Sequence, residues 1–304
     1  MNGGNAGGRG IEAVDAGSTG VGAVGAGNDM TRSSTHPRTA KQARLVSRYG
    51  PWAIVTGASD GIGRAFAYDL AAAGLNVVLV ARRGEILNQI AGELRAQHRV
   101  STLVITADLA RADAVAMINA ATSDLDAGLL VAAAGFGTSG PLIDGPLQPE
   151  LEMVDVNCRA VLALSHEFGR RFAERGRGGI VLLSSLVAFQ GVPRTANYAA
   201  TKAYVQSLAE GLRVELGLRG VDVLASAPGP ISSGFASRAR LTMGMTQTPA
   251  DVAQASLDAL GRRGTVRPGW LAKGLGASLM FLPRWGRVRV MGKVMAGMTK
   301  HGDA

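Results

Sequence analysis

The chain has 304 residues, of which 47% are hydrophobic and 18% are charged. This length and composition exclude a fully disordered chain and favour one large globular domain with flanking tails. Lys and Arg number 32 against 23 Asp and Glu, so the formal net charge is +9, which favours anionic partners such as nucleotide phosphates, lipid head groups or nucleic acid. The single cysteine, Cys158, excludes an internal disulfide and fits a reducing, cytoplasmic location.

The first 40 residues are rich in Gly, Ala, Ser and Asn and show neither a helical nor a strand period. Such a composition is typical of flexible segments, so we predict a flexible tail over residues 1–45. This tail has no continuous apolar run, and we therefore expect no secretory signal. Further along, only ten uncharged residues separate Lys273 from Arg284, fewer than the ~20 apolar residues of a membrane-spanning helix.

From Trp52 onward, short apolar runs alternate with longer segments of helical period. The pattern predicts strands at 52–56, 76–81, 101–106, 128–134, 179–184, 221–226 and 264–267, and helices at 62–73, 84–96, 111–122, 149–175 and 197–217. Strands that are apolar throughout and separated by helices are typical of a parallel sheet covered on both faces. We therefore predict an α/β, doubly wound fold with a seven-stranded parallel sheet over residues 46–268, followed by an extension over 269–304.

Three glycines follow the first predicted strand in the pattern Gly57-x-x-x-Gly61-x-Gly63, directly before a predicted helix. Glycines in such a turn let a pyrophosphate approach the backbone, and a helix N-terminus offers free N–H groups and a positive dipole end. A purely structural strand-to-helix turn is the alternative. The phosphate-binding hypothesis assigns cofactor contacts to the loop residues Gly57, Ser59, Asp60, Gly61, Ile62 and Gly63.

Two arginines, Arg82 and Arg83, follow the second predicted strand, where a nucleotide-binding fold that uses NAD carries an acidic residue. Guanidinium groups pair well with a 2′-phosphate, so the sequence predicts NADP(H) as the cofactor rather than NAD(H). A solvated start of the next helix is the alternative. Asp108 and Leu109 close the third predicted strand, and we expect them near the adenine.

Tyr198 and Lys202 lie four residues apart at the start of a predicted helix, so they share one face. A phenol is a poor acid or base at neutral pH, and a nearby ammonium lowers its pKa. Taken alone, this spacing is common by chance and usually belongs to a surface pair. Ser185 ends the fifth predicted strand, and Pro228 with Gly229 follows the sixth, at the edge where parallel sheets bind ligands. Together these residues predict a catalytic site beside a cofactor.

The combination of TGASDGIG, Ser185 thirteen residues before YAATK, and PGP after the next strand resembles the short-chain dehydrogenase/reductase family. The resemblance covers residues 50 to about 260 and implies a Rossmann fold with the strand order 3-2-1-4-5-6-7. It implies that Tyr198 is the acid/base on the substrate oxygen, that Lys202 lowers its pKa and binds the nicotinamide ribose, and that Ser185 polarises the carbonyl. It also implies that Asn157 holds a water in a proton relay, for which a plain helix-interior asparagine is the alternative.

By position, the resemblance adds Ala134, Gly135, Ile231 and Ser233 to the cofactor site. Ser233 stands where a threonine commonly bonds the nicotinamide carboxamide in this family. One departure concerns the segment after the fourth strand, where the family usually has Asn-Asn-Ala-Gly and this chain has alanines at positions 132 and 133. The missing amides put the affinity for the cofactor, rather than the chemistry, in question. We predict no metal site.

Residues 50–83 resemble the branch of the family that contains 3-ketoacyl-CoA reductases and 17β-hydroxysteroid dehydrogenases, together with bacterial relatives. This resemblance implies interconversion of a carbonyl and a secondary alcohol on a lipophilic, acyl or steroid-like small molecule. A nucleotide-binding regulator without turnover is the alternative function. The family's long helices, predicted here at 149–175 and 197–217, commonly pair across a two-fold axis, so we expect a homodimer or homotetramer.

Residues 262–300 contain nine Lys or Arg and no acidic residue. Within them, Val288, Met291, Met295 and Met298 recur at helical spacing beside basic residues, as in an interfacial amphipathic helix. Two interpretations follow: peripheral contact with an anionic membrane surface, or a helix that packs over the substrate cleft with its charges in solvent. No recognition motif accompanies the charge, so we expect no nucleic-acid partner.

Overall fold

The computed structural model describes residues 39–232, 247–269 and 281–299, together with Gly234, Ala239 and Gly274. The predicted tail lies outside these residues up to position 38. Helix α1 (Ala40–Tyr49) then begins with a capping box between Thr39 and Gln42. The boundary predicted at residue 45 is therefore too late, because the helix begins inside the segment assigned to the tail.

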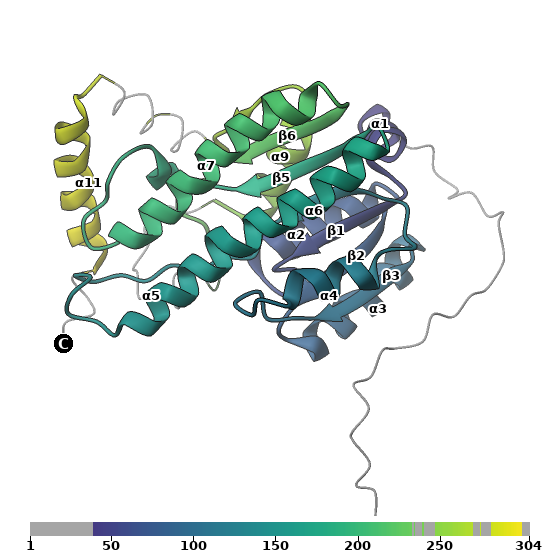
Figure 1. Ribbon diagram of the computed structural model, residues 1–304, viewed down its shortest axis with the longest axis horizontal. Helices are drawn as coiled ribbons and strands as arrows, with labels where there is room; N and C mark the ends of the chain where they lie inside the picture. The colour runs from purple at the N-terminus through teal and green to yellow at the C-terminus, as the bar shows by residue number, and fades with distance from the viewer. Residues whose placement is uncertain are drawn as a thin grey trace, which may run out of the picture. The chain divides into compact units, whose positions relative to one another are not determined.

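A seven-stranded parallel sheet forms the centre of the fold, with the strand order β3-β2-β1-β4-β5-β6-β7 (Figure 1). This confirms the predicted fold and strand order. The strands are β1 (Trp52–Thr56), β2 (Asn76–Ala81), β3 (Thr102–Thr106), β4 (Ala127–Ala132), β5 (Gly178–Leu183), β6 (Val221–Ser226) and β7 (Thr265–Val266). Their carboxyl ends meet along one edge of the sheet.

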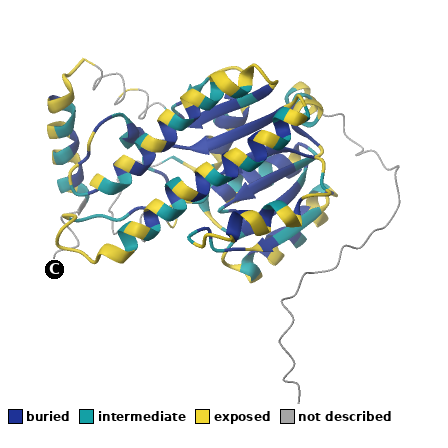
Figure 2. Cartoon of the chain, in the orientation of Figure 1, coloured by how far each residue is buried: buried dark blue, intermediate teal, exposed yellow. Residues whose placement is uncertain are grey.

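Helices cover both faces of the sheet, because alternate strand residues point to opposite sides. Ala53 and Val55 of β1 pack in the core cluster formed with α2 (Gly61–Ala72), α3 (Gly84–His98) and α9 (Pro249–Ala259). Ile54 packs in the second cluster, with α4 (Ala114–Ala121), α6 (Ala160–Glu174) and α7 (Ala196–Gly217). The strands are buried between these layers (Figure 2). This rigid core fixes the strand ends that carry the candidate site.

The long helix predicted over 149–175 is divided in the structure. Helix α5 (Leu147–Val154) runs into a π-helical turn, η1 (Asp155–Arg159), and α6 follows. Such π turns are rare and recur at functional sites. Asn157 lies in this turn, so the irregularity falls on a residue of the predicted catalytic set.

Helix α1 is fixed at the amino-end edge of the sheet. The Tyr49 hydroxyl donates a hydrogen bond to Asp222 at the start of β6, over 2.7 Å. Arg44 donates to the carbonyl oxygens of Leu257 and Leu260, at 2.9 Å each, where α9 ends. These carbonyls lack partners within their own helix, so the arginine satisfies them. Within the described ranges, no helix combines the length and the apolar character needed to cross a bilayer.

Candidate active site

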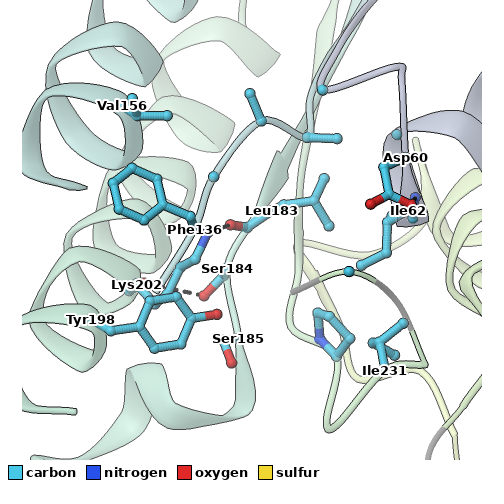
Figure 3. A pocket seen from close by; sticks show the side chains of 18 of the residues that line it. Asp60, Ile62, Phe136, Val156, Leu183, Ser184, Ser185, Tyr198, Lys202 and Ile231 are labelled. Atoms are coloured by element: carbon cyan, nitrogen blue, oxygen red, sulfur yellow. Dashed lines mark hydrogen bonds between the residues drawn. The ribbon is translucent and has the colours of Figure 1, made fainter. Parts of the chain in front are cut away.

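A cavity of about 700 Å³ lies at the carboxyl-end edge of the sheet. Every predicted cofactor residue in the described part of the chain lines this cavity, and so do Ser185, Tyr198 and Lys202 (Figure 3). Ser233 lies outside the described residues. Segments far apart in the sequence therefore converge on one pocket, as expected where parallel strands end.

The glycines of the first turn are required by close backbone contacts. Gly57 has a φ of +68°, and a Cβ at this position would lie 2.9 Å from the backbone nitrogen of Ala134. A Cβ on Gly63 would lie 2.4 Å from the carbonyl oxygen of Gly57. Asp60 caps α2 by accepting a hydrogen bond from the Gly61 N–H. The loop thus leaves a close backbone approach at a helix N-terminus, which fits the pyrophosphate of a dinucleotide.

The two arginines after β2 differ in their surroundings. The Arg83 guanidinium donates to the Ser59 hydroxyl at 3.0 Å and lies 3.8 Å from the Asp60 carboxylate. Arg82 is exposed, lines the cavity, and makes no hydrogen bond or ion pair with other described residues. Arg83 therefore holds the glycine-rich loop, whereas Arg82 has its donors available for a ligand phosphate.

Hydrogen bonds donated by backbone N–H groups hold the edges of the nucleotide site. Asp108 accepts a hydrogen bond from the Ala110 N–H at 3.1 Å, which orients the turn after β3. The Ala134 N–H donates to the Thr56 hydroxyl at 3.1 Å. This bond braces β1 against the segment after β4, where the usual asparagines are absent. The Leu186 N–H donates to the Pro228 carbonyl at 2.9 Å and ties the turn after β6 to the segment after β5.

Tyr198 and Ser185 meet on one wall of the cavity (Figure 3). Ser185 caps the short helix η2 (Leu186–Phe189), and Tyr198 lies in the first turn of α7. Burial raises the pKa of Tyr198 to about 12, against a lowering by its hydrogen bond with Ser185. The phenol is thus protonated at neutral pH and positioned beside a second hydroxyl.

Lys202 is a buried ammonium, with 6% of its surface exposed. Its Nζ donates to the Leu183 carbonyl at 2.8 Å and lies 5.8 Å from the centre of the Tyr198 ring. Burial lowers the pKa of Lys202 to about 8. The expected lowering of the Tyr198 pKa by this lysine stays a prediction, because the pKa of Tyr198 here is shifted by burial and by Ser185.

Asn157 lies fully buried behind the cavity, in the π turn. Its amide accepts from the Phe136 N–H at 3.2 Å, and its Nδ2 donates to the Phe136 carbonyl at 2.9 Å and to the Thr201 hydroxyl at 3.1 Å. A Cβ on Gly135 would lie 3.0 Å from the Asn157 oxygen. The amide therefore fastens the segment after β4 to α7, which supports the same wall as Lys202.

Sequence reasoning missed a carboxylate that joins two walls of the site. Glu150 of α5 accepts from the Thr138 hydroxyl at 2.6 Å and from the Asn197 amide at 2.8 Å, next to Tyr198. No motif marks this contact, since its partners are separated by 12 and 47 residues. The carboxylate positions the start of α7 without touching the cavity.

The C-terminal helix α11 (Arg284–Thr299) supplies the apolar end of the cavity. Met291 and Met295 are 3% and 5% exposed. They pack with Val192, which lies in the segment between Ser185 and Tyr198, and with Ala199 near the start of α7. The methionine face of this helix is therefore turned into the protein, as in the cleft-covering interpretation of the sequence.

Comparison with known proteins identifies the family. The model of the short chain dehydrogenase family matches residues 51–244. A 7beta-hydroxysteroid dehydrogenase of Mediterraneibacter gnavus is 30% identical over 238 residues, which cover 74% of this chain and 88% of the relative. The chain therefore belongs to the short-chain dehydrogenase family, and it is an oxidoreductase of carbonyl and alcohol groups.

Other relatives include proteins named as dehydrogenases and proteins named as inactive. A 7beta-hydroxysteroid dehydrogenase of Collinsella aerofaciens is 36% identical over 179 residues, covering 59% of this chain and 68% of the relative. A human protein named inactive hydroxysteroid dehydrogenase-like protein 1 is 33% identical over 195 residues, covering 63% and 59%. The presence of Ser185, Tyr198 and Lys202 in one pocket is consistent with an active chain.

Solved structures resemble this fold over most of its length. A structure from a study of 7beta-hydroxysteroid dehydrogenase stereoselectivity superposes with a TM-score of 0.76 at 30% identity, covering 81% of this chain and 98% of the other. A short-chain dehydrogenase from Sphingobium yanoikuyae in complex with NADPH superposes with a TM-score of 0.69 at 28% identity, covering 77% and 97%.

We predict that Lys202→Met stabilises the protein without cofactor while it removes turnover. The lysine pKa falls from 10.5 to about 8 on burial, so the unfolded chain holds this proton more tightly, and the buried charge costs about 3 kcal/mol below pH 8. This cost disappears between pH 8 and 10.5 as the folded-state lysine loses its proton. Urea unfolding of both proteins at neutral and alkaline pH measures the difference, which should shrink as the pH rises. A variant less stable than the wild type at neutral pH would contradict this account.

Proposed function

We propose that this chain is an NADP(H)-dependent oxidoreductase that interconverts a carbonyl and a secondary alcohol on a bulky, lipophilic, steroid-like molecule. One observation carries the proposal: the Ser185 and Tyr198 hydroxyls lie in a single cavity with a dinucleotide-type loop at one end and an apolar wall at the other. The names of the 7beta-hydroxysteroid dehydrogenase relatives support a steroid-like substrate. The NADPH complex of a structural neighbour supports the cofactor.

The proton chemistry follows from the two hydroxyls. The nicotinamide of a bound cofactor supplies or accepts the hydride. Ser185 donates a hydrogen bond to the carbonyl oxygen, which polarises it. Burial keeps the pKa of Tyr198 near 12, so the phenol is protonated at neutral pH and gives its proton to that oxygen during reduction. Lys202 would hold the ribose of the cofactor, and the hydrogen bond from its Nζ to the Leu183 carbonyl keeps the side chain in place.

The apolar end of the cavity suits a bulky substrate. Leu186, Val187, Met291, Met295 and Met298 line it, and methionine side chains adapt to irregular apolar shapes. A rigid polycyclic molecule would bury its surface against this wall while its carbonyl reached Tyr198. A small polar carbonyl compound would leave the wall in contact with water, at a cost in binding.

Replacing Tyr198 by Phe should abolish turnover while cofactor binding persists, since the phenol supplies the proton but little of the affinity. Positioned acid/base catalysis typically contributes ~100-fold or more, so the variant should keep less than about 1% of the rate. NADPH absorbance with a keto-steroid measures turnover, and fluorescence titration measures binding. If the wild type binds NADPH but oxidises none of it across a broad carbonyl panel, the chain is a nucleotide-binding regulator.

Arg82→Ala should weaken NADP(H) binding by roughly 10- to 100-fold and leave NAD(H) binding almost unchanged, because a hydrogen bond to a charged phosphate contributes about 1.5–3 kcal/mol. Arg83→Ala is the informative comparison: it releases Ser59 and the loop, so both cofactors should bind less well. Titration of each protein with NADPH and NADH measures this. A wild-type preference for NADH would refute the assignment.

We also propose that two copies of the chain associate through α5, α6 and α7. Large apolar side chains are exposed on each of these helices, among them Leu147 (68%) of α5, Leu162 (48%) of α6 and Val214 (70%) of α7. Contact with a second copy of the chain would remove these side chains from water. Light scattering should show a dimer or tetramer at micromolar concentration, and Val214→Asp should shift it towards monomer. A wild-type monomer would contradict the proposal.

Peripheral contact with anionic membranes is a further proposal, for the outer side of α11. Arg284, Trp285, Arg289 and Lys293 are exposed there, and the described helix has no acidic residue. Each basic side chain near an anionic surface contributes about 1 kcal/mol. Co-sedimentation with anionic vesicles should occur at low salt and be lost in Arg289→Glu/Lys293→Glu. Protein that stays in the supernatant would leave α11 as a cover over the site only.

A further inference from the structure

The apolar end of the cavity contains one charged side chain that the chemistry above does not use. Of the charged residues that line the cavity, Asp60, Arg82, Arg83 and Asp108 lie at the nucleotide end and Lys202 at the centre. Glu152 of α5 is the remaining one among the described residues. It lies five residues before Asn157, about 7 Å away along the helix axis at 1.5 Å per residue. Glu152 lines the cavity, and the helix that carries it extends beyond the carboxyl-end edge of the sheet on the same side as α11 (Figure 1).

The fold makes no use of the Glu152 carboxylate. Its neighbours on the same helix are engaged: Glu150 accepts hydrogen bonds from Thr138 and Asn197, and Asp155 pairs with Arg159. Glu152 is half-buried, and its carboxylate makes no hydrogen bond or ion pair with any described residue. A partly buried carboxylate without a partner lowers the stability of the folded chain. A structural role therefore does not explain the presence of Glu152.

A second polar group of the cavity also lacks a hydrogen-bond partner. Thr195 lines the cavity three residues before Tyr198, is 5% exposed, and its hydroxyl is unpaired among the described residues. Leu186, Met291 and Met295 are among the apolar residues that line the same cavity. A carboxylate only accepts hydrogen bonds, and a hydroxyl can donate or accept. The complementary ligand is therefore apolar along its length and carries a hydrogen-bond donor at its far end.

We propose that Glu152 is a specificity-determining residue that favours neutral lipophilic substrates with a hydroxyl at the end remote from the reacting carbonyl, and disfavours substrates with a carboxylate there. The proposal rests on the proposed function, whose substrate class it narrows. A substrate hydroxyl donates to Glu152 and replaces a hydrogen bond to water. A substrate carboxylate meets a like charge with little water between them, which is costly in a partly desolvated pocket.

Three matched compounds test the proposal: a keto-steroid with a side-chain carboxylate, its methyl ester, and the corresponding primary alcohol. These differ only at the far end. With NADPH, kcat/KM of the wild type should be about tenfold higher for the alcohol than for the carboxylate, with the ester between them, as expected for one like-charge contact. In Glu152→Gln, which keeps the shape and removes the charge, the ratio of alcohol to carboxylate should fall to within about twofold.

The matched control is Glu174→Gln, which removes a surface carboxylate on α6 that is 59% exposed. It should keep the wild-type ratio, which excludes an effect of net charge. Melting temperatures of the three proteins show whether each variant is folded. Calorimetric binding of the same compounds to the NADP⁺ complex gives a second readout that does not depend on turnover.

The outcomes separate the two proposals. If the wild type turns over the compounds but favours the carboxylate, or if Glu152→Gln leaves the ratio unchanged, the role of Glu152 is wrong and the proposed function stands. If none of the compounds reacts but binding follows the expected order and the variant abolishes it, the selectivity stands and the proposed steroid reaction is wrong. If none of them binds, both proposals are refuted.

Discussion

The parallel direction of the seven strands is the constraint on which the site depends. Because all strands end at one edge, the turns after β1, β2, β3, β4, β5 and β6 all reach the same cavity. These turns bring different groups to the cavity, among them the glycines after β1, the two arginines after β2 and the Ser185 hydroxyl after β5. A single antiparallel strand would send its turn to the opposite edge and remove that contribution.

Burial at this edge also sets the chemistry of the catalytic groups. It raises the pKa of Tyr198 and lowers that of Lys202. Burial therefore favours the neutral form of both groups. The ammonium is held by the Leu183 carbonyl rather than by a carboxylate. A negatively charged cofactor would therefore favour the charged lysine, which links nucleotide binding to the readiness of the acid/base pair.

The sequence predicted the parts of the fold in which local pattern and tertiary environment agree. The strands were predicted to within two residues because they read as apolar runs, and the central ones are buried on both faces. Helix α1 was missed because it is short and mostly polar and adjoins the Gly-rich segment, although Thr39 and Gln42 carry a capping box that marks its start. The π turn around Asn157 was missed because no residue pattern distinguishes it from a continuing α-helix.

In the site, residues with motifs were predicted and residues without them were not. The loop glycines, Ser185, Tyr198 and Lys202 have fixed spacings, whereas Glu150 acts through partners 12 and 47 residues away in the sequence. The methionine spacing near the C-terminus indicated an apolar face but left open what that face contacts. Only tertiary packing could decide between solvent, lipid and the pocket.

The packing of α11 on the loop between the two catalytic hydroxyls has an evolutionary consequence. Gly292 lies against Pro193, and Met291 and Met295 pack on the same segment. The nucleotide half of the pocket is built from the first part of the chain, and the far wall is completed by its last helix. Replacement of this terminal helix in a related gene would change the wall that contacts the substrate. The part of the pocket built from the first strands would stay the same. Substrate range can therefore evolve through this one helix.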